Sequence, residues 1–294
     1  MISRSLYDSV WHPYTPILMS SRSDSEYCAG QVRAYDYDRY FSAAFAPAET
    51  RRGLFALYAF NIEIASARER VSEALLGELR LQWWREAIAE IYNGSIRDHA
   101  VVAELAHAIE KFSLPGDTFE RMIDGRLFDM REEAPEDINA LDNYITATAG
   151  ELVCASYRIC GIVGQDDQAR QQGSIWGGTG LLRALPFHLS QRRVYLPKDL
   201  LRKAGTTASV VADSGPRLNL SPATAELACI LHARLNDNRK IEKPVRPAVA
   251  YLALSRNYLR RLQRNGYDVF AQGLEGPRSL RQFGILRSMV SGKI

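Results

Sequence analysis

Apolar residues recur along most of the chain at intervals of three and four positions, the spacing of one face of an α-helix. In residues 72–94, Leu79 and Trp83 lie on such a face, Ser72 is the expected N-cap, and Gly94 ends the pattern. This periodicity predicts helices over 47–71, 72–94, 98–112, 116–131, 139–163, 168–190, 221–241, 245–264 and 278–291.

Strand signals are nearly absent from the sequence. The only short β-branched run, at 209–213, lies in a stretch rich in Gly, Ser and Thr, so 195–220 is predicted to be a long loop with one short helix. Helical segments flank it without a change of composition. We therefore predict one all-α domain over residues 35–294, preceded by a mobile N-terminal arm over 1–34.

Composition excludes several classes of protein. Of 294 residues, 46% are hydrophobic and 24% charged, which is typical of a globular chain. The formal net charge of +3 is too small to indicate a nucleic-acid partner, and no apolar run is long enough to span a bilayer. The four cysteines form no CxxC pair and are expected to be free thiols, as in a reducing compartment.

The charge is unevenly distributed. Residues 243–294 carry +8 and the remainder −5, and the final segment 278–291 alternates basic with apolar side chains. This pattern suits an amphipathic helix on an anionic membrane, and it equally suits a helix docked on the domain. Because the N-terminus lacks an apolar signal region, we expect a cytoplasmic protein at the periphery of the inner membrane, on the matrix side if the source is eukaryotic.

Four segments in order resemble the squalene/phytoene synthase family: RRGLFALYAF at 51–60, MIDGRLFDM at 122–130, YITATAGELV at 144–153 and RRVYLP at 192–197. The resemblance implies an isoprenoid-synthase-like helical bundle around a central cavity. It also implies the family's chemistry, the head-to-head joining of two prenyl diphosphates. In that reaction two Asp-rich clusters hold magnesium against the diphosphate leaving group.

The sequence departs from the family at those clusters. Alignment on Tyr58 places Ala65, Ser66 and Glu69 at the first three carboxylate positions. Counting back from Tyr195 places Ala184, Phe187 and His188 at the second three carboxylate positions. Only Glu69 of the six residues is therefore an acid. We therefore expect no catalytic residue, metal site or cofactor, with magnesium required only if the chain is an enzyme after all.

Other polar residues are expected to line a cavity inherited from the family. Pro186 is expected to break or kink its helix and to turn Arg183 and His188 toward that cavity. Trp83 and Trp84 either line a prenyl tunnel or divide between core and surface. The candidate cavity residues are Tyr58, Asn61, Asp124, Asp129, Arg183, His188, Arg193 and Tyr195.

The stretch LLRALPFHLSQRRVYLPKDLL, at 181–201, resembles a non-catalytic branch of the family, the mitochondrial complex I assembly factor of squalene/phytoene synthase type. The resemblance implies a role in assembling respiratory complex I or a related membrane complex, with a subunit or assembly partner of that complex. Two alternatives stay open: a prenyl diphosphate transferase with an altered metal site, and a carrier of an isoprenoid or lipid ligand.

Overall fold

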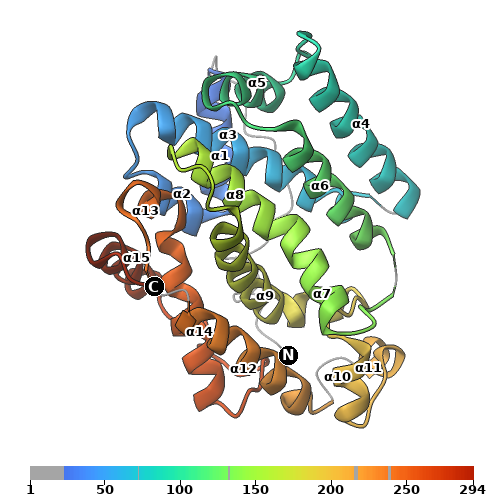
Figure 1. The fold of residues 1–294 in the computed structure, drawn as a ribbon. Helices are drawn as coiled ribbons and strands as arrows, with labels where there is room; N and C mark the ends of the chain where they lie inside the picture. Colours follow the sequence, from blue (N-terminus) through green and yellow to red (C-terminus); the bar gives the residue numbers. More distant parts are fainter. Residues whose placement is uncertain (1–22, 72, 132, 215–217, 238–239) are drawn as a thin grey trace.

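The computed structural model describes residues 23–71, 73–131, 133–214, 218–237 and 240–294. Its regular structure is helical, and the one β-type pairing in the described residues is an isolated bridge between Lys240 and Lys293. The all-α prediction is confirmed. α9 runs through the middle of the molecule, between an upper group of helices and a lower group (Figure 1).

The upper part begins with α1 and continues through α6, followed by a short 3-10 turn. The bounds are α1 Asp24–Tyr35, α2 Tyr37–Ala43, α3 Ala48–Ala65, α4 Ala74–Tyr92, α5 Ala100–Phe112 and α6 Gly116–Leu127.

The second half of the chain supplies the centre and the lower part. A π-helical turn, Thr146–Gly150, joins α7 to α8. The bounds are α7 Ile138–Ile145, α8 Glu151–Ile159, α9 Asp166–Ser190, α10 Lys198–Lys203, α11 Ala208–Ser214, α12 Ser221–Asp237, α13 Arg246–Val249, α14 Ala253–Arg264 and α15 Arg278–Ser291.

The core consists of two hydrophobic clusters that share α9. Ile175 and Trp176 belong to the upper cluster with most of α3, α5 and α8, whereas Leu182, Leu185 and Leu189 belong to the lower one. Close packing at the centre needs glycine. A Cβ at Gly173 would lie only 2.3 Å from the carbonyl oxygen of Ala149, so any other residue would push α9 away from the π-helical turn.

Helix α1 corrects the predicted arm. Residues 24–34 are helical, Cys28 and Val32 are buried, and α1 packs on α3 and α5. A capping box between Ser23 and Glu26 fixes the start of the helix. Only two of the twelve residues of α1 are buried, so the sequence of this helix shows almost no apolar periodicity. Residues 1–22 and the predicted N-cap Ser72 lie outside the described part of the chain.

Several other element predictions need correction. The helices predicted over 139–163 and 221–241 end earlier, at Ile159 and Asp237. α3 ends at Ala65 and is followed by turns over 66–70, so the helix predicted to residue 71 is too long. Two short helices, α10 and α11, replace the single one expected in the long loop, and the β-branched run lies inside α11. α9 continues without a break through Pro186 to Ser190.

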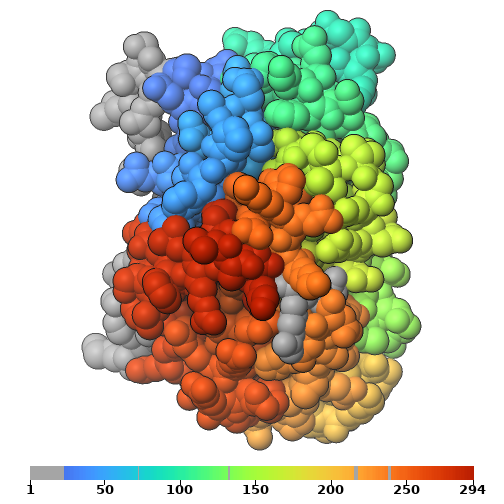
Figure 2. All heavy atoms as spheres, turned by 60° about the vertical axis from the view of Figure 1, so that its left-hand side comes forward, coloured from blue at the N-terminus to red at the C-terminus, as the bar shows by residue number. Residues whose placement is uncertain are grey.

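The C-terminal helix α15 has the predicted bounds and is docked on the domain. Ile285 is buried, and Arg246 donates to the backbone carbonyls of Met289 and Val290 near the end of the helix. Figure 2 shows this C-terminal segment lying against the N-terminal helices. In the described residues, no helix is long and apolar enough to cross a membrane.

Candidate functional site

Asp129 is the centre of a buried polar cluster between α6, α7 and the segment that follows α9. Its Oδ1 accepts hydrogen bonds from the hydroxyl groups of Tyr144, at 2.8 Å, and Tyr195, at 2.7 Å. Its Oδ2 accepts from Nη1 of Arg126 at 3.2 Å, and Arg193 donates to its backbone carbonyl. The carboxylate is 5% exposed, and neighbouring side chains of the same chain occupy both of its oxygens.

Burial determines the protonation states around Asp129. Burial lowers the pKa of His188 to about 4, and the positive charge of Arg193 adds to this effect, so the imidazole is neutral at pH 7. Burial likewise raises the pKa of Tyr195, with Tyr144 and Asp129 adding to the rise. The hydroxyl groups of Tyr144 and Tyr195 therefore stay protonated and act as hydrogen-bond donors to Asp129. The cluster thus combines Asp129 with neutral rings and half-buried guanidinium groups.

Glu69 lies at the edge of this cluster. It follows the end of α3 and is half-buried in the turns over 66–70. Burial raises its pKa, although the nearby guanidinium of Arg193 acts in the opposite direction. Of the six positions that the family resemblance assigns to metal-binding acids, this one alone holds an acid, and its surroundings disfavour the charged form that binds a cation.

The first three of these positions do not share a helical face. Ala65 is the last residue of α3, and Ser66 caps the helix end by donating to the carbonyl of Ile62 at 2.7 Å. Because the helix stops there, Glu69 is not one helical turn beyond Ala65 on the same face. In the part of the chain that the structure describes, no three His, Cys, Asp or Glu side chains are grouped so that they could hold a metal ion.

On α9, His188 and Arg183 lie in different surroundings. The His188 ring is 4.6 Å from that of Tyr195 and belongs to the Asp129 cluster, with Nδ1 buried and without a hydrogen-bond partner. Arg183 instead donates to both carboxylate oxygens of Glu275, at 2.6 and 2.8 Å, and its guanidinium lies 5.2 Å from the Trp176 ring. The two side chains therefore do not share a site.

Arg183 belongs to a second buried cluster that ties α15 to the body. Asp38 of α2 pairs with Arg281 of α15 and lies 3.9 Å from Arg183, and Arg281 is also 3.5 Å from Glu275. Burial alone would raise the pKa of Glu275, but the facing arginines lower it overall, so the carboxylate is charged. The adjoining cavity has a volume of about 10 Å³, room for a single water molecule.

The remaining candidates lie apart from both clusters. The Tyr58 hydroxyl donates to the carbonyl of Ala248 at 3.1 Å, and its ring is 5.6 Å from the buried guanidinium of Arg39. Asn61 is buried one turn further along α3. Asp124 is 60% exposed and pairs with Arg85 at 2.6 Å. The structure therefore brings together Asp129, His188, Arg193 and Tyr195, and it places the other four candidates elsewhere.

The tryptophan pair divides between core and surface, as one of the two sequence alternatives proposed. Trp84 is 2% exposed and packs edge-to-face on Phe60 with ring centroids 5.3 Å apart. Trp83 is 36% exposed on the outer side of α4. Trp84 therefore fills the upper core.

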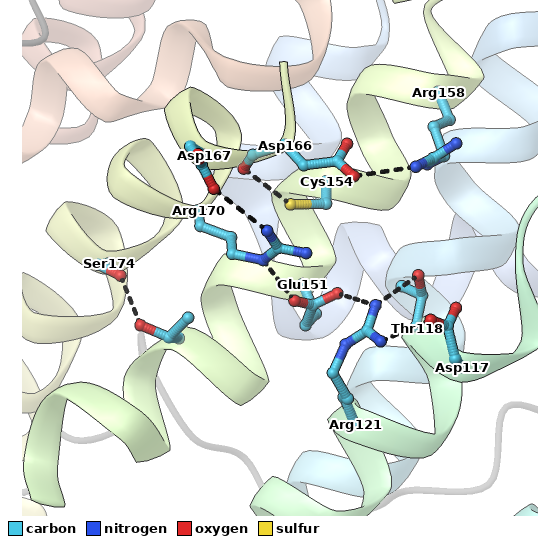
Figure 3. Close-up of polar contacts among 11 residues, drawn as sticks. Asp117, Thr118, Arg121, Glu151, Cys154, Arg158, Asp166, Asp167, Arg170 and Ser174 are labelled. Carbon is cyan, nitrogen blue, oxygen red and sulfur yellow. Dashed lines mark hydrogen bonds and ion pairs between the residues drawn. The ribbon is translucent and has the colours of Figure 1, made fainter. Parts of the chain in front are cut away.

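Sequence reasoning missed several polar residues of these helices. Arg126 and Tyr144 lie inside two of the quoted family segments, so those segments carried the signal that could have found them. Glu151 is 3% exposed and joins α6 to α9 through Arg121, at 2.9 Å, and Arg170, at 2.7 Å (Figure 3). Both arginines lie far from Glu151 in the sequence, so no local sequence pattern indicates these ion pairs.

Comparisons with known proteins show the family and the fold of this chain. The family described as squalene/phytoene synthase matches residues 32–282. "NADH dehydrogenase (ubiquinone) complex I, assembly factor 6" of Mus musculus is 30% identical over 256 residues, covering 85% of this chain and 77% of its own. Presqualene diphosphate synthase of Rhodopseudomonas palustris is 27% identical, and the match covers 90% of this chain and 95% of the synthase. The crystal structure of a dehydrosqualene synthase has a TM-score of 0.77 at 18% identity, covering 91% and 95%, which shows a shared fold.

Proposed function

Because this chain belongs to the squalene/phytoene synthase family, we propose that it keeps the family fold but not magnesium-dependent prenyl transfer. Its role in this proposal is the assembly of respiratory complex I or a related membrane complex. The similarity to complex I assembly factor 6 over most of both chains supports the assembly role. The observation that carries the loss of chemistry is that one half-buried acid, Glu69, stands at the six positions that the family resemblance assigns to metal-binding carboxylates.

Electrostatics explain why these positions are unsuited to prenyl transfer. Ionising an allylic diphosphate leaves several negative charges on the leaving group, and divalent cations held by carboxylates normally stabilise them. Here Asp129 is already paired with Arg126 and two tyrosine hydroxyls, and Glu69 alone supplies no divalent site. The proposal therefore includes no cofactor and no magnesium requirement.

We further propose that the protein contacts an anionic membrane surface through the outer face of α15, at the periphery of the inner membrane. Leu280, Phe283 and Val290 are exposed there at 54, 65 and 82%. The charged side chains exposed on this helix, Arg278 and Arg287, are both basic. Apolar side chains flanked by cations favour binding to anionic lipid, and the attraction is screened by salt.

Deletion of the gene in its natural host tests this function. We expect a loss of assembled complex I on native gels and of NADH:ubiquinone oxidoreductase activity, both restored by the wild-type chain. Squalene and carotenoid levels, measured in the same cells, should be unchanged. Normal complex I together with a missing isoprenoid product would contradict the proposal and support the enzyme alternative.

A further inference from the structure

Helix α4 carries a second exposed apolar face, distant from α15. Leu75 and Leu79 are exposed at 61 and 57%, Leu76 at 44%, and Trp83 at 36%. Spacings of three and four place Leu76, Leu79 and Trp83 along one side of the helix. α4 packs on α3, α5 and α6 with its other side and forms an edge of the molecule (Figure 1). A contiguous exposed patch of this kind marks an interaction site.

The exposed charges of α4 and of the residue before it are acidic. Glu73, Glu78 and Glu86 are exposed, whereas the two arginines of the helix, Arg80 and Arg85, are half-buried and paired with carboxylates of α3 and α6. Within the described residues, Glu73 and Glu78 have no ion-pair partner. The outer surface of α4 therefore combines leucines with unneutralised negative charge.

Trp83 is held in place by its neighbours. Its ring lies 5.0 Å from that of Trp84 and 5.5 Å from that of His99, and the Arg97 guanidinium lies 5.0 Å from the ring centroid. Arg97 is fixed in turn by ion pairs to Glu90, at 2.6 Å, and Glu86. A half-exposed aromatic ring that is already ordered loses little conformational entropy on binding, which suits an anchor residue.

We propose that this α4 face docks a basic amphipathic helix of a partner protein. Leu75, Leu76, Leu79 and Trp83 would receive its apolar stripe, and Glu73 and Glu78 would face its Lys or Arg residues. An anionic lipid surface does not fit, because it repels exposed glutamates. A symmetric pair of α4 faces does not fit either, because it brings like charges together. The inference rests on the proposed function in one respect only: the partner is taken to be a protein that takes part in assembling the complex.

Two labelled peptides test the proposal with the purified full chain. Each has about 18 residues, enough to form a helix, with leucine at helical spacing and either lysine or glutamate at the other positions. By fluorescence anisotropy, the lysine peptide should bind saturably and at least about tenfold more tightly than the glutamate peptide. Leu79→Ser should weaken this binding about tenfold, whereas the matched control Leu280→Ser on α15 should leave it unchanged.

Charge reversal sharpens the test. Glu73→Lys combined with Glu78→Lys should transfer the preference to the glutamate peptide. Equal binding of the two peptides, or lysine-peptide binding that Leu79→Ser leaves intact, would overturn the proposal. So would self-association of the wild-type chain that Leu79→Ser abolishes, since the occupant would then be a second copy. None of these measurements involves complex I, so the peptide result and the deletion phenotype can fail separately.

Discussion

The buried cluster around Asp129 and the exposed faces of α4 and α15 differ in how completely their groups are partnered. Inside, both oxygens of the Asp129 carboxylate accept hydrogen bonds, from Arg126, Tyr144 and Tyr195. The neighbouring His188 is neutral, and its buried Nδ1 is the exception without a hydrogen-bond partner. Outside, leucines and aromatic rings lie in solvent beside charges of one sign, acidic on α4 and basic on α15. Exposed apolar surface of this kind is characteristic of binding sites, whereas the paired groups around Asp129 are characteristic of a packed interior.

The largest expected effect comes from opening the buried cluster. Asp129→Ala leaves the Arg126 guanidinium buried without its carboxylate, which should lower the free energy of unfolding by about 3–5 kcal/mol. Urea unfolding followed by circular dichroism measures this loss. Asp124→Ala is the matched control from the same segment, because its exposed carboxylate should matter by less than about 1 kcal/mol. Equal losses in the two variants would contradict a closed cluster.

Deleting residues 279–294 tests whether α15 is docked as well as exposed. The deletion removes Ile285 and Ile294 from the core and Arg281 from its pairing with Asp38. Burial of the two isoleucines alone suggests a loss of about 4 kcal/mol in the free energy of unfolding. Differential scanning calorimetry should show a fall in Tm of about 10 °C. An unchanged Tm would mean that α15 contributes only a surface and no stability.

The buried imidazole predicts an acid-dependent loss of stability. The pKa of His188 is about 4 in the folded chain, against an ordinary value of 6.5, so between these values the unfolded chain binds a proton that the folded one does not. Stability from this residue is complete above pH 6.5 and falls as the pH drops toward 4, by up to about 3 kcal/mol. His188→Gln, which does not titrate, should flatten the dependence of the urea midpoint between pH 7 and pH 5. An equally steep dependence in the variant would contradict a buried neutral imidazole.

The smallest effects on stability are expected at the exposed faces, where the effect on binding is large. Phe283→Asp should change the free energy of unfolding by less than about 0.5 kcal/mol and should abolish sedimentation with anionic liposomes. Leu79→Ser on α4 is the matched control and should leave liposome binding unchanged. If both variants bind liposomes like the wild type, α15 is not the membrane surface.

Sequence reasoning predicted the longer helices best. The bounds of α15 were predicted correctly, and those of α4 and α9 within two residues. It failed where tertiary contacts outweigh local preference. α9 continues through Pro186 because Leu182, Leu185 and Leu189 anchor both sides of the proline in the lower core. α1 was missed because so few of its side chains are buried.

The candidate site was predictable only within the family segments. Asp129, Arg193 and Tyr195 lie in such segments and meet in one cluster. Arg183 could not be placed, because its partner Glu275 is 92 residues away and belongs to no motif. A buried ion pair between remote segments depends on how the helices pack, which a linear pattern does not contain.

Incubation of the purified full chain with radiolabelled farnesyl or geranylgeranyl diphosphate and magnesium tests the central claim most directly. Because the inherited metal positions hold Ala65, Ser66 and His188 and the neighbouring Asp129 is already paired, we predict no head-to-head prenyl product above the protein-free control. An active synthase of the family, assayed in parallel, establishes the detection limit. Product that forms only with magnesium and disappears in Glu69→Ala would contradict the account and show that this chain still performs prenyl transfer.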